Sequence, residues 1–335
     1  MQASPASQPW QQVPIHLRRS YWELAEAERH ALRSALEQEA DALARDLDAT
    51  EAAYAALPET LRGRLVNADL MATLLPTLRA NPTQGYEALE DPGGQAVAHL
   101  NTLGKRLRDR ALQLAGSTPV LILMGGQASG KTTGAWALGR AFGAVFDAPH
   151  TDPEALAFLV RRIRDDWPWA QIHLAYADRS PESSLYAMLD RSEREGRYVP
   201  LDRMARTHAR APHTFLGLAS LQDEGLCLYH VRTRWNATPI VTEGEEAVTG
   251  VAGRQKPTES AVAWRLQTAY LSHLRTIPHD PSARHPRDVL AGLNRTLEPW
   301  RRAEAHHLLQ RLSEDVAGGS AQGRPGPQGP PPPSA

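Results

Sequence analysis

The chain has 335 residues and a formal net charge of −1 at pH 7. This near-neutral balance gives no general attraction to nucleic acid or to an anionic membrane, so neither is expected as a partner. The single cysteine, Cys227, excludes an internal disulfide and fits a reducing compartment. No apolar stretch approaches the ~18 residues of a membrane span, and the N-terminus lacks the pattern of a signal peptide. We therefore expect a cytoplasmic protein.

The N-terminal part of the chain is predicted to be mostly helical. Apolar side chains recur at helical spacing over residues 21–47, with Glu and Arg on the opposite face, and more helix is expected up to Pro58. The patterns that follow predict a short extended segment, an apolar helix, a turn-rich stretch and a further helix, at residues 65–66, 70–78, 82–94 and 96–114.

Residues 120–133 read V-L-I-L-M-G-G-Q-A-S-G-K-T-T and fit the phosphate-binding P-loop pattern G-x-x-x-x-G-K-[ST] between an apolar strand and a helix predicted for residues 132–142. Glycines allow backbone N–H groups to turn towards a phosphate. Lys131 is expected to reach the β- and γ-phosphates, and the Thr132 hydroxyl to hold Mg²⁺. The alternative is a Gly-rich turn without a ligand. The nucleotide-binding residues predicted here are Gly125, Gly126, Gln127, Ala128, Ser129, Gly130, Lys131, Thr132 and Thr133.

Strands and helices are predicted to alternate after this motif. Strands are expected at residues 144–147, 172–176, 226–233 and 240–241. Helices are expected to begin at Asp152-Pro153 and Ser180-Pro181, and to cover residues 261–274 and 287–312. This order predicts an α/β fold: a P-loop NTPase or kinase-like parallel sheet with helices on both faces. The predicted regions are 1–60 (helical), 61–245 (core, with the Asp69 segment in 61–115), 246–316 (helical) and 317–335 (a disordered Pro/Gly-rich tail).

The chain resembles the zeta toxin family, P-loop kinases that phosphorylate UDP-N-acetylglucosamine, over roughly residues 63–242. Four segments carry the resemblance: the P-loop at 125–132, V-F-D-A-P-H-T at 145–151, L-D-R-S-E-R-E-G-R-Y-V-P at 189–200, and G-R-L-V-N-A-D-L-M at 63–71. The third is similar to the family segment R-x-x-x-x-x-G-R-x-V-P. The last is similar to the family segment with the substrate-activating aspartate. In the family that segment follows the P-loop helix, whereas Asp69 precedes it here. We interpret this as a relocation, as in a circular permutation, that still allows the segment a neighbouring position in the sheet.

Five side chains are expected to carry the chemistry, from the P-loop motif, their positions and the resemblance together. Asp69 would accept the proton of the substrate hydroxyl; its alternative role is an N-cap for the following helix. Arg191 and Arg197 would close over the transferred phosphoryl group, or else lie at a solvated helix end. Asp147 would bind Mg²⁺ with Thr132, or else be a carboxylate in a turn. Lys131 completes the predicted catalytic set.

These observations favour an ATP-dependent kinase that uses Mg²⁺ and transfers a γ-phosphoryl group to a hydroxyl of a small substrate. The resemblance suggests UDP-N-acetylglucosamine as that substrate and an antitoxin-like protein as a partner. A second hypothesis is a non-catalytic, nucleotide-binding interaction protein with a degenerate kinase core. A third, a polynucleotide kinase, would need a basic channel with stacking aromatics; the neutral charge and 6% aromatic content argue against it.

Overall fold

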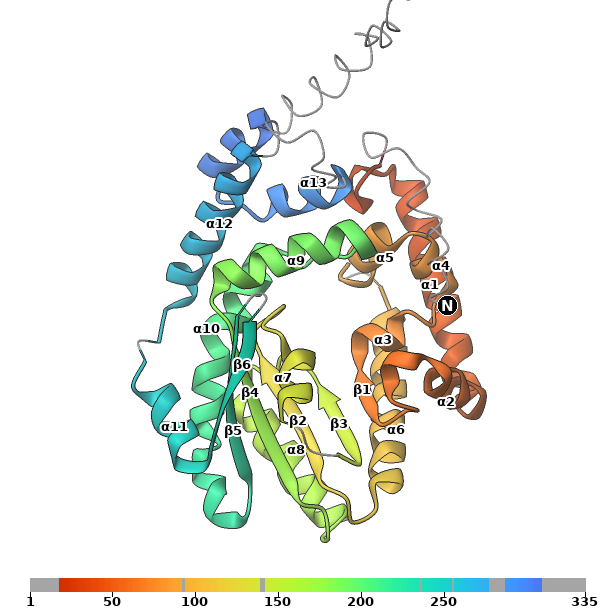
Figure 1. Ribbon diagram of the computed structural model, residues 1–335. Helices are drawn as coiled ribbons and strands as arrows, with labels where there is room; N and C mark the ends of the chain where they lie inside the picture. The colour runs from red at the N-terminus through yellow and green to blue at the C-terminus, as the bar shows by residue number, and fades with distance from the viewer. Residues whose placement is uncertain are drawn as a thin grey trace, which may run out of the picture.

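The computed structural model describes residues 18–91, 94–138, 142–234, 237–254, 256–276 and 287–308. The first part of the predicted N-terminal region, the last four residues of the helix predicted at 287–312 and the tail predicted to be disordered lie outside the described residues. At the centre is a six-stranded sheet with the order β1-β3-β2-β4-β5-β6 (Figure 1). Its strands are β1 (Leu65–Asn67), β2 (Val120–Gly125), β3 (Ala144–Asp147), β4 (Ile172–Asp178), β5 (Cys227–Arg234) and β6 (Ala237–Glu243).

The sheet is mixed and mostly parallel, which confirms the α/β class. Strands β1, β3, β2, β4 and β5 pair in parallel, whereas β6 pairs with β5 antiparallel. The prediction of a wholly parallel sheet is therefore wrong at this edge. Only residues 235–236 separate β5 from β6. A parallel pair needs a crossover of a dozen or more residues, so a connection this short allows only a hairpin.

Strand β1, the extended segment that precedes Asp69, lies at the opposite edge of the sheet. It pairs with β3, which separates it from the P-loop strand β2. The register sets Asn67 beside Asp147 at the carboxyl ends of β1 and β3. An upstream segment thus reaches the same end of the sheet as the P-loop, although it does not adjoin the P-loop strand.

Helices cover both faces of this sheet. Four of them, α6, α8, α10 and α11, bury one face in the largest apolar cluster, while α7 and α3 lie against the other face. Their bounds are α3 (Ala68–Ala72), α6 (Ala96–Ala115), α7 (Lys131–Ala137), α8 (Pro153–Asp166), α10 (Leu201–Gly217) and α11 (Gly244–Ala252). The predicted N-caps of α8 and of α9 (Pro181–Glu195) are confirmed: Asp152 accepts from Glu154 N at 2.9 Å and Ser180 from Ser183 N at 3.2 Å.

The N-terminal helices differ from the prediction at three places. The helix predicted from Tyr21 begins at Glu26 and breaks at Asp46, whose side chain caps the next helix through Ala49 N. The helix predicted at 70–78 divides because Pro76 cannot continue it. The stretch 82–94 is not merely turn-rich, since it begins with a helix that starts at Pro82. The helices here are α1 (Glu26–Arg45), α2 (Leu47–Ala56), α4 (Pro76–Ala80) and α5 (Pro82–Leu89).

A C-terminal helical layer packs on α9 and α10 and buries a separate apolar cluster with them. The layer contains α12 (Glu259–Thr276), α13 (Arg287–Arg295) and a helical segment at 299–308. The helix predicted at 287–312 is interrupted at 296–298. Helix α10 was not predicted, and most of α11 falls in the region 246–316 that was expected to be helical, although no separate helix was predicted there. Figure 1 shows α9 crossing above the carboxyl ends of the strands. The described helices include none with the length and apolar character needed to cross a membrane.

A buried carboxylate joins the N-terminal helices to the C-terminal layer. Glu87 on α5 is 4% exposed; it accepts from Tyr198 Oη at 2.6 Å and Arg295 Nη2 at 2.7 Å, and from the backbone N of Tyr21 at 2.6 Å. Tyr198 lies between α9 and α10, and Arg295 at the end of α13. One side chain therefore fixes three segments that are distant in the sequence.

Replacing Glu87 by glutamine should lower the free energy of unfolding by about 2 kcal/mol, because the neutral amide loses the charge-assisted bond to Arg295 and turns a donor towards other donors. Urea unfolding of Glu87→Gln against Glu26→Gln, an exposed glutamate on α1, measures this. Equal stability of the two variants would show that the cluster does not hold these segments together.

Candidate functional site

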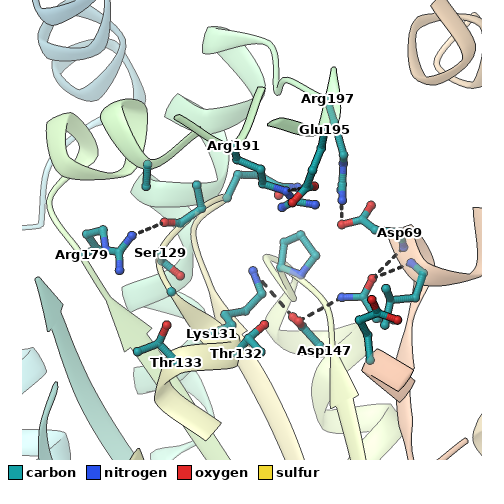
Figure 2. A pocket seen from close by; sticks show the side chains of 18 of the residues that line it. Asp69, Ser129, Lys131, Thr132, Thr133, Asp147, Arg179, Arg191, Glu195 and Arg197 are labelled. Carbon is teal, nitrogen blue, oxygen red and sulfur yellow. Dashed lines mark hydrogen bonds and ion pairs between the residues drawn. The ribbon is translucent and has the colours of Figure 1, made fainter. Parts of the chain in front are cut away.

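All of the predicted site residues except Gly125 and Gly126 line one large cavity at the carboxyl ends of the parallel strands. The cavity has a volume of about 980 Å³ and extends from α3 and α5, past the P-loop and the end of β3, to the β5–β6 hairpin. Figure 2 shows the polar side chains that face it. Ligands of open α/β sheets bind in this kind of crevice, outside the carboxyl ends of the strands.

The P-loop keeps several backbone donors available. The N–H groups of Gly130, Lys131 and Thr132 donate to no acceptor in the part of the chain that the structure describes. Gly130 has φ +83° and Ala128 has φ +56°, so the loop turns through the left-handed region that brings successive N–H groups to one side. A loop of this form suits an anion with several acceptor oxygens.

Lys131 and Asp147 face each other within the cavity (Figure 2). The Lys131 Nζ lies 3.8 Å from Asp147 Oδ1 and 3.4 Å from the carbonyl of Gly126, and both side chains are nearly buried. Asn67 Nδ2 donates to Asp147 Oδ2 at 3.0 Å, which fixes the carboxylate. Asp147 Oδ1 is buried and accepts no hydrogen bond from the described residues. A carboxylate that only stabilised a turn would not need these contacts with Lys131 and Asn67. The Oδ1 atom of Asp147 remains able to bind a further partner.

Asp69 and Arg197 form an ion pair across the cavity (Figure 2). Asn67 caps α3 through the N–H groups of Asp69 and Leu70, so the alternative reading of Asp69 as the N-cap is wrong. Burial alone would raise the pKa of Asp69. The Arg197 charge and hydrogen bond outweigh burial, with smaller help from Arg191 and Lys131, and hold this pKa below its usual value. Asp69 is therefore a carboxylate at neutral pH.

The two predicted arginines differ in their surroundings. The Arg197 side chain is only 10% exposed and its guanidinium lies 4.7 Å above the ring of Tyr86, so the solvated alternative does not describe it. Arg191 lines the same cavity but is 38% exposed and pairs with Glu195 one helical turn away, at 2.6 Å. Arg197 is thus nearly buried in contact with Asp69 and Tyr86, whereas Arg191 is more exposed and pairs with Glu195.

Two side chains of helix α10 form hydrogen bonds to the backbone of the P-loop. His208 Nε2 donates to the Gln127 carbonyl at 2.9 Å, and Thr207 Oγ1 accepts from Gln127 N at 3.0 Å. The His208 ring lies so close to Gly126 that a Cβ there would be 2.5 Å from it. Burial lowers the pKa of His208 to about 4, against a smaller opposing effect of the Gln127 bond. The ring is therefore neutral at pH 7.

The low pKa of His208 predicts that the folded protein loses stability in acid. Because the folded pKa is about 4 and the ordinary value is 6.5, the unfolded chain binds the extra proton between these values. The contribution of neutral His208 to the free energy of unfolding is fully present above about pH 6.5. It decreases as the pH falls towards 4, by about 3 kcal/mol in total. Urea unfolding at pH 7 and at pH 4 should show a smaller loss for His208→Gln than for the wild type. An identical loss in both proteins would contradict this role.

Sequence reasoning missed four residues of the site. Arg179 follows β4 and Asn67 ends β1, and the rule that placed Asp147 at a strand end could have found both. Tyr86 lies on a helix that was taken for turns, and no sequence signal connects His208 with a loop about 80 residues upstream.

The donor set also decides how a magnesium ion could bind. Among the described residues, no three or more His, Cys, Asp and Glu side chains lie close enough together to hold a metal ion by themselves. Asp147 supplies one buried oxygen without a hydrogen bond, and Thr132 lines the same cavity. Mg²⁺ commonly binds through one or two protein oxygens together with phosphate oxygens and water, so these residues fit an ion that arrives with a nucleotide.

The comparisons with known proteins add no relative to this picture. Neither the scan against models of protein families nor the search of curated proteins returns a match for this chain. Function is therefore inferred from the geometry and the chemistry of the cavity.

Proposed function

We propose that this protein is an ATP-dependent phosphotransferase with a P-loop kinase-like core. It transfers the γ-phosphoryl group of ATP to a hydroxyl of a small substrate. The zeta toxin resemblance of residues 63–242 makes UDP-N-acetylglucosamine the first acceptor to test. One observation carries the proposal: the P-loop lysine and a carboxylate from a separate, upstream segment line the same cavity.

The charges of the cavity suit phosphoryl transfer, in which the protein mainly positions groups and neutralises charge. Lys131 and the free N–H groups of the P-loop bind the β- and γ-phosphates. Arg197 and Arg191 lie on the side of the cavity that Asp69 lines, where they can stabilise the charge on the transferred group. Phosphate oxygens then replace the carboxylates that these cations contact in the structure.

In the reaction, the acceptor oxygen forms a bond to the γ-phosphorus and the bond from that phosphorus to the β–γ bridging oxygen breaks. Asp69 takes the proton of the acceptor hydroxyl, and ADP leaves with the bridging oxygen. While it pairs with Arg197, Asp69 is ionised at neutral pH, so it enters the reaction as a carboxylate that can accept a proton. Arg197 must turn from Asp69 towards the phosphates to release the carboxylate for this step.

Asp147 and Thr132 would hold Mg²⁺. The ion, when bound, neutralises charge on the phosphates. Asn67 orients Asp147 for this purpose through its amide.

The function is tested in two steps with the full chain. Calorimetry with MgATP measures binding, and release of ADP is then followed with and without UDP-N-acetylglucosamine and other hydroxyl compounds. The proposal expects binding together with ADP release that depends on an acceptor. Binding without acceptor-dependent release would favour the non-catalytic nucleotide-binding protein. No heat with MgATP or MgGTP would exclude both hypotheses.

A further inference from the structure

Another arginine of the cavity, Arg179, lies on the other side of the P-loop from Asp69. Arg179 directly follows β4, the neighbour of the P-loop strand on the side away from β3. Figure 2 shows Arg179 and Asp69 at opposite sides of the view, with Lys131 and Thr132 between them. Arg179 therefore occupies the part of the cavity that leads to the β5–β6 hairpin.

The P-loop itself fixes the Arg179 side chain. Its Nη1 donates to the Ala128 carbonyl at 3.2 Å, and its Nε to Thr233 Oγ1 at 3.2 Å. Thr233 in turn donates to the Ser129 carbonyl at 2.5 Å. The remaining nitrogen, Nη2, lies 2.7 Å from the position that a Cβ on Gly130 would occupy. Two hydrogen bonds and this close approach thus hold the guanidinium against the loop, and the N–H groups on Nη2 bond to no described residue.

The charge of Arg179 has no carboxylate to neutralise it. No Asp or Glu of the described residues lies within ion-pair distance of its guanidinium, and burial is the cause that lowers its pKa. The other arginines that line the cavity near Asp69 each have a carboxylate partner; the pairs are Arg191–Glu195, Arg194–Asp190, Arg197–Asp69 and Arg203–Glu90. A half-buried guanidinium stays charged, so a bound anion at Nη2 would offset the cost of its burial.

The position of Arg179 indicates which part of a nucleotide it would meet. Since the acceptor must reach Asp69, the γ-phosphate points to that side and the β-phosphate lies at Lys131. The α-phosphate then lies on the opposite side of the loop, next to Arg179. We propose that Arg179 binds the α-phosphate of the nucleotide through Nη2, as a binding residue that ATP and ADP use alike. This inference rests on the proposed function. Arginine suits the role because its fork can hold the loop carbonyl and a phosphate oxygen at once.

The test compares Arg179→Gln with the wild type by calorimetry, using MgATP and MgADP. Glutamine keeps an amide donor for the Ala128 carbonyl but removes the charge. We expect both affinities to fall by the same factor, about 10- to 100-fold for the loss of a charged hydrogen bond. The KM for ATP should rise with them, while kcat at saturating ATP changes little, because the α-phosphate does not change during transfer. The dependence of log Kd on log salt should become shallower, since one phosphate contact is lost.

Thr233→Val is the matched control, since it removes the hydroxyl that accepts from Arg179 and donates to the Ser129 carbonyl but keeps the charge of Arg179. It should weaken binding less than Arg179→Gln and keep the wild-type salt dependence. Two results would overturn the inference while the proposed function stands: Arg179→Gln binds both nucleotides as the wild type does, or it loses affinity for ATP alone. If both substitutions lower the nucleotide affinity equally and leave the salt dependence unchanged, Arg179 only stabilises the loop and does not bind the phosphate. A wild-type protein that binds neither nucleotide would remove the proposed function itself.

Discussion

Replacing Lys131 by alanine should lower the rate of phosphoryl transfer on the order of 10²- to 10³-fold, the loss expected when one fixed cation or donor is removed from a transferring group. Lys131 is nearly buried, and its ammonium contacts only the Gly126 carbonyl and Asp147 in the described structure. The affinity for MgATP should fall as well, because the β- and γ-phosphates lose their point charge. Calorimetry and acceptor-dependent ADP release measure the two effects separately.

Two variants separate this loss from a loss of folding. Lys131→Ala leaves the Asp147 carboxylate buried without its cation, which destabilises the protein. The double variant Lys131→Ala/Asp147→Asn removes that charge and should recover thermal stability but not activity. Lys105→Ala, an exposed lysine on α6, should match the wild type in both assays. Full transfer by a folded Lys131→Ala protein would exclude the P-loop as the phosphate site.

The second large effect is expected at Asp69. Asp69→Asn should lower kcat on the order of 10²- to 10⁴-fold, the usual contribution of a general base, while MgATP binds nearly as before. The reason is that asparagine keeps the shape of the side chain but cannot accept the proton of the acceptor hydroxyl. Because the pKa of Asp69 lies below its usual value, protonation of this residue should not limit the wild-type rate between about pH 5 and 8.

Asp202→Asn, an exposed aspartate in the first turn of α10, is the control for this variant. A thermal melt must accompany the assay, since Asp69→Asn also removes the carboxylate partner of Arg197. Transfer at the wild-type rate by Asp69→Asn would refute its assignment as the base and leave the P-loop assignment intact. Unchanged Kd for MgATP with lost turnover is the pattern that supports the proposal.

Local patterns predicted most of the elements that form the centre of the sheet. The apolar run before Gly125 is the buried strand β2, and the Asp152-Pro153 and Ser180-Pro181 pairs begin helices as their capping chemistry requires. The patterns failed where local and tertiary preferences compete. Residues 201–217 form a helix although Pro212 lies inside it, and packing against β2, α8 and α12 stabilises that helix.

The sequence by itself determined the P-loop, the α/β alternation and the short extended segment before Asp69, because each depends on residues within one or two turns of chain. Only the tertiary structure decided that β1 pairs with β3, that Asp69 meets Arg197, and that Arg179 lies on the P-loop opposite them. These contacts join residues that are far apart along the chain. Periodicity shows which side of each element is buried, but the order in which strands pair depends on how all the apolar faces are covered together.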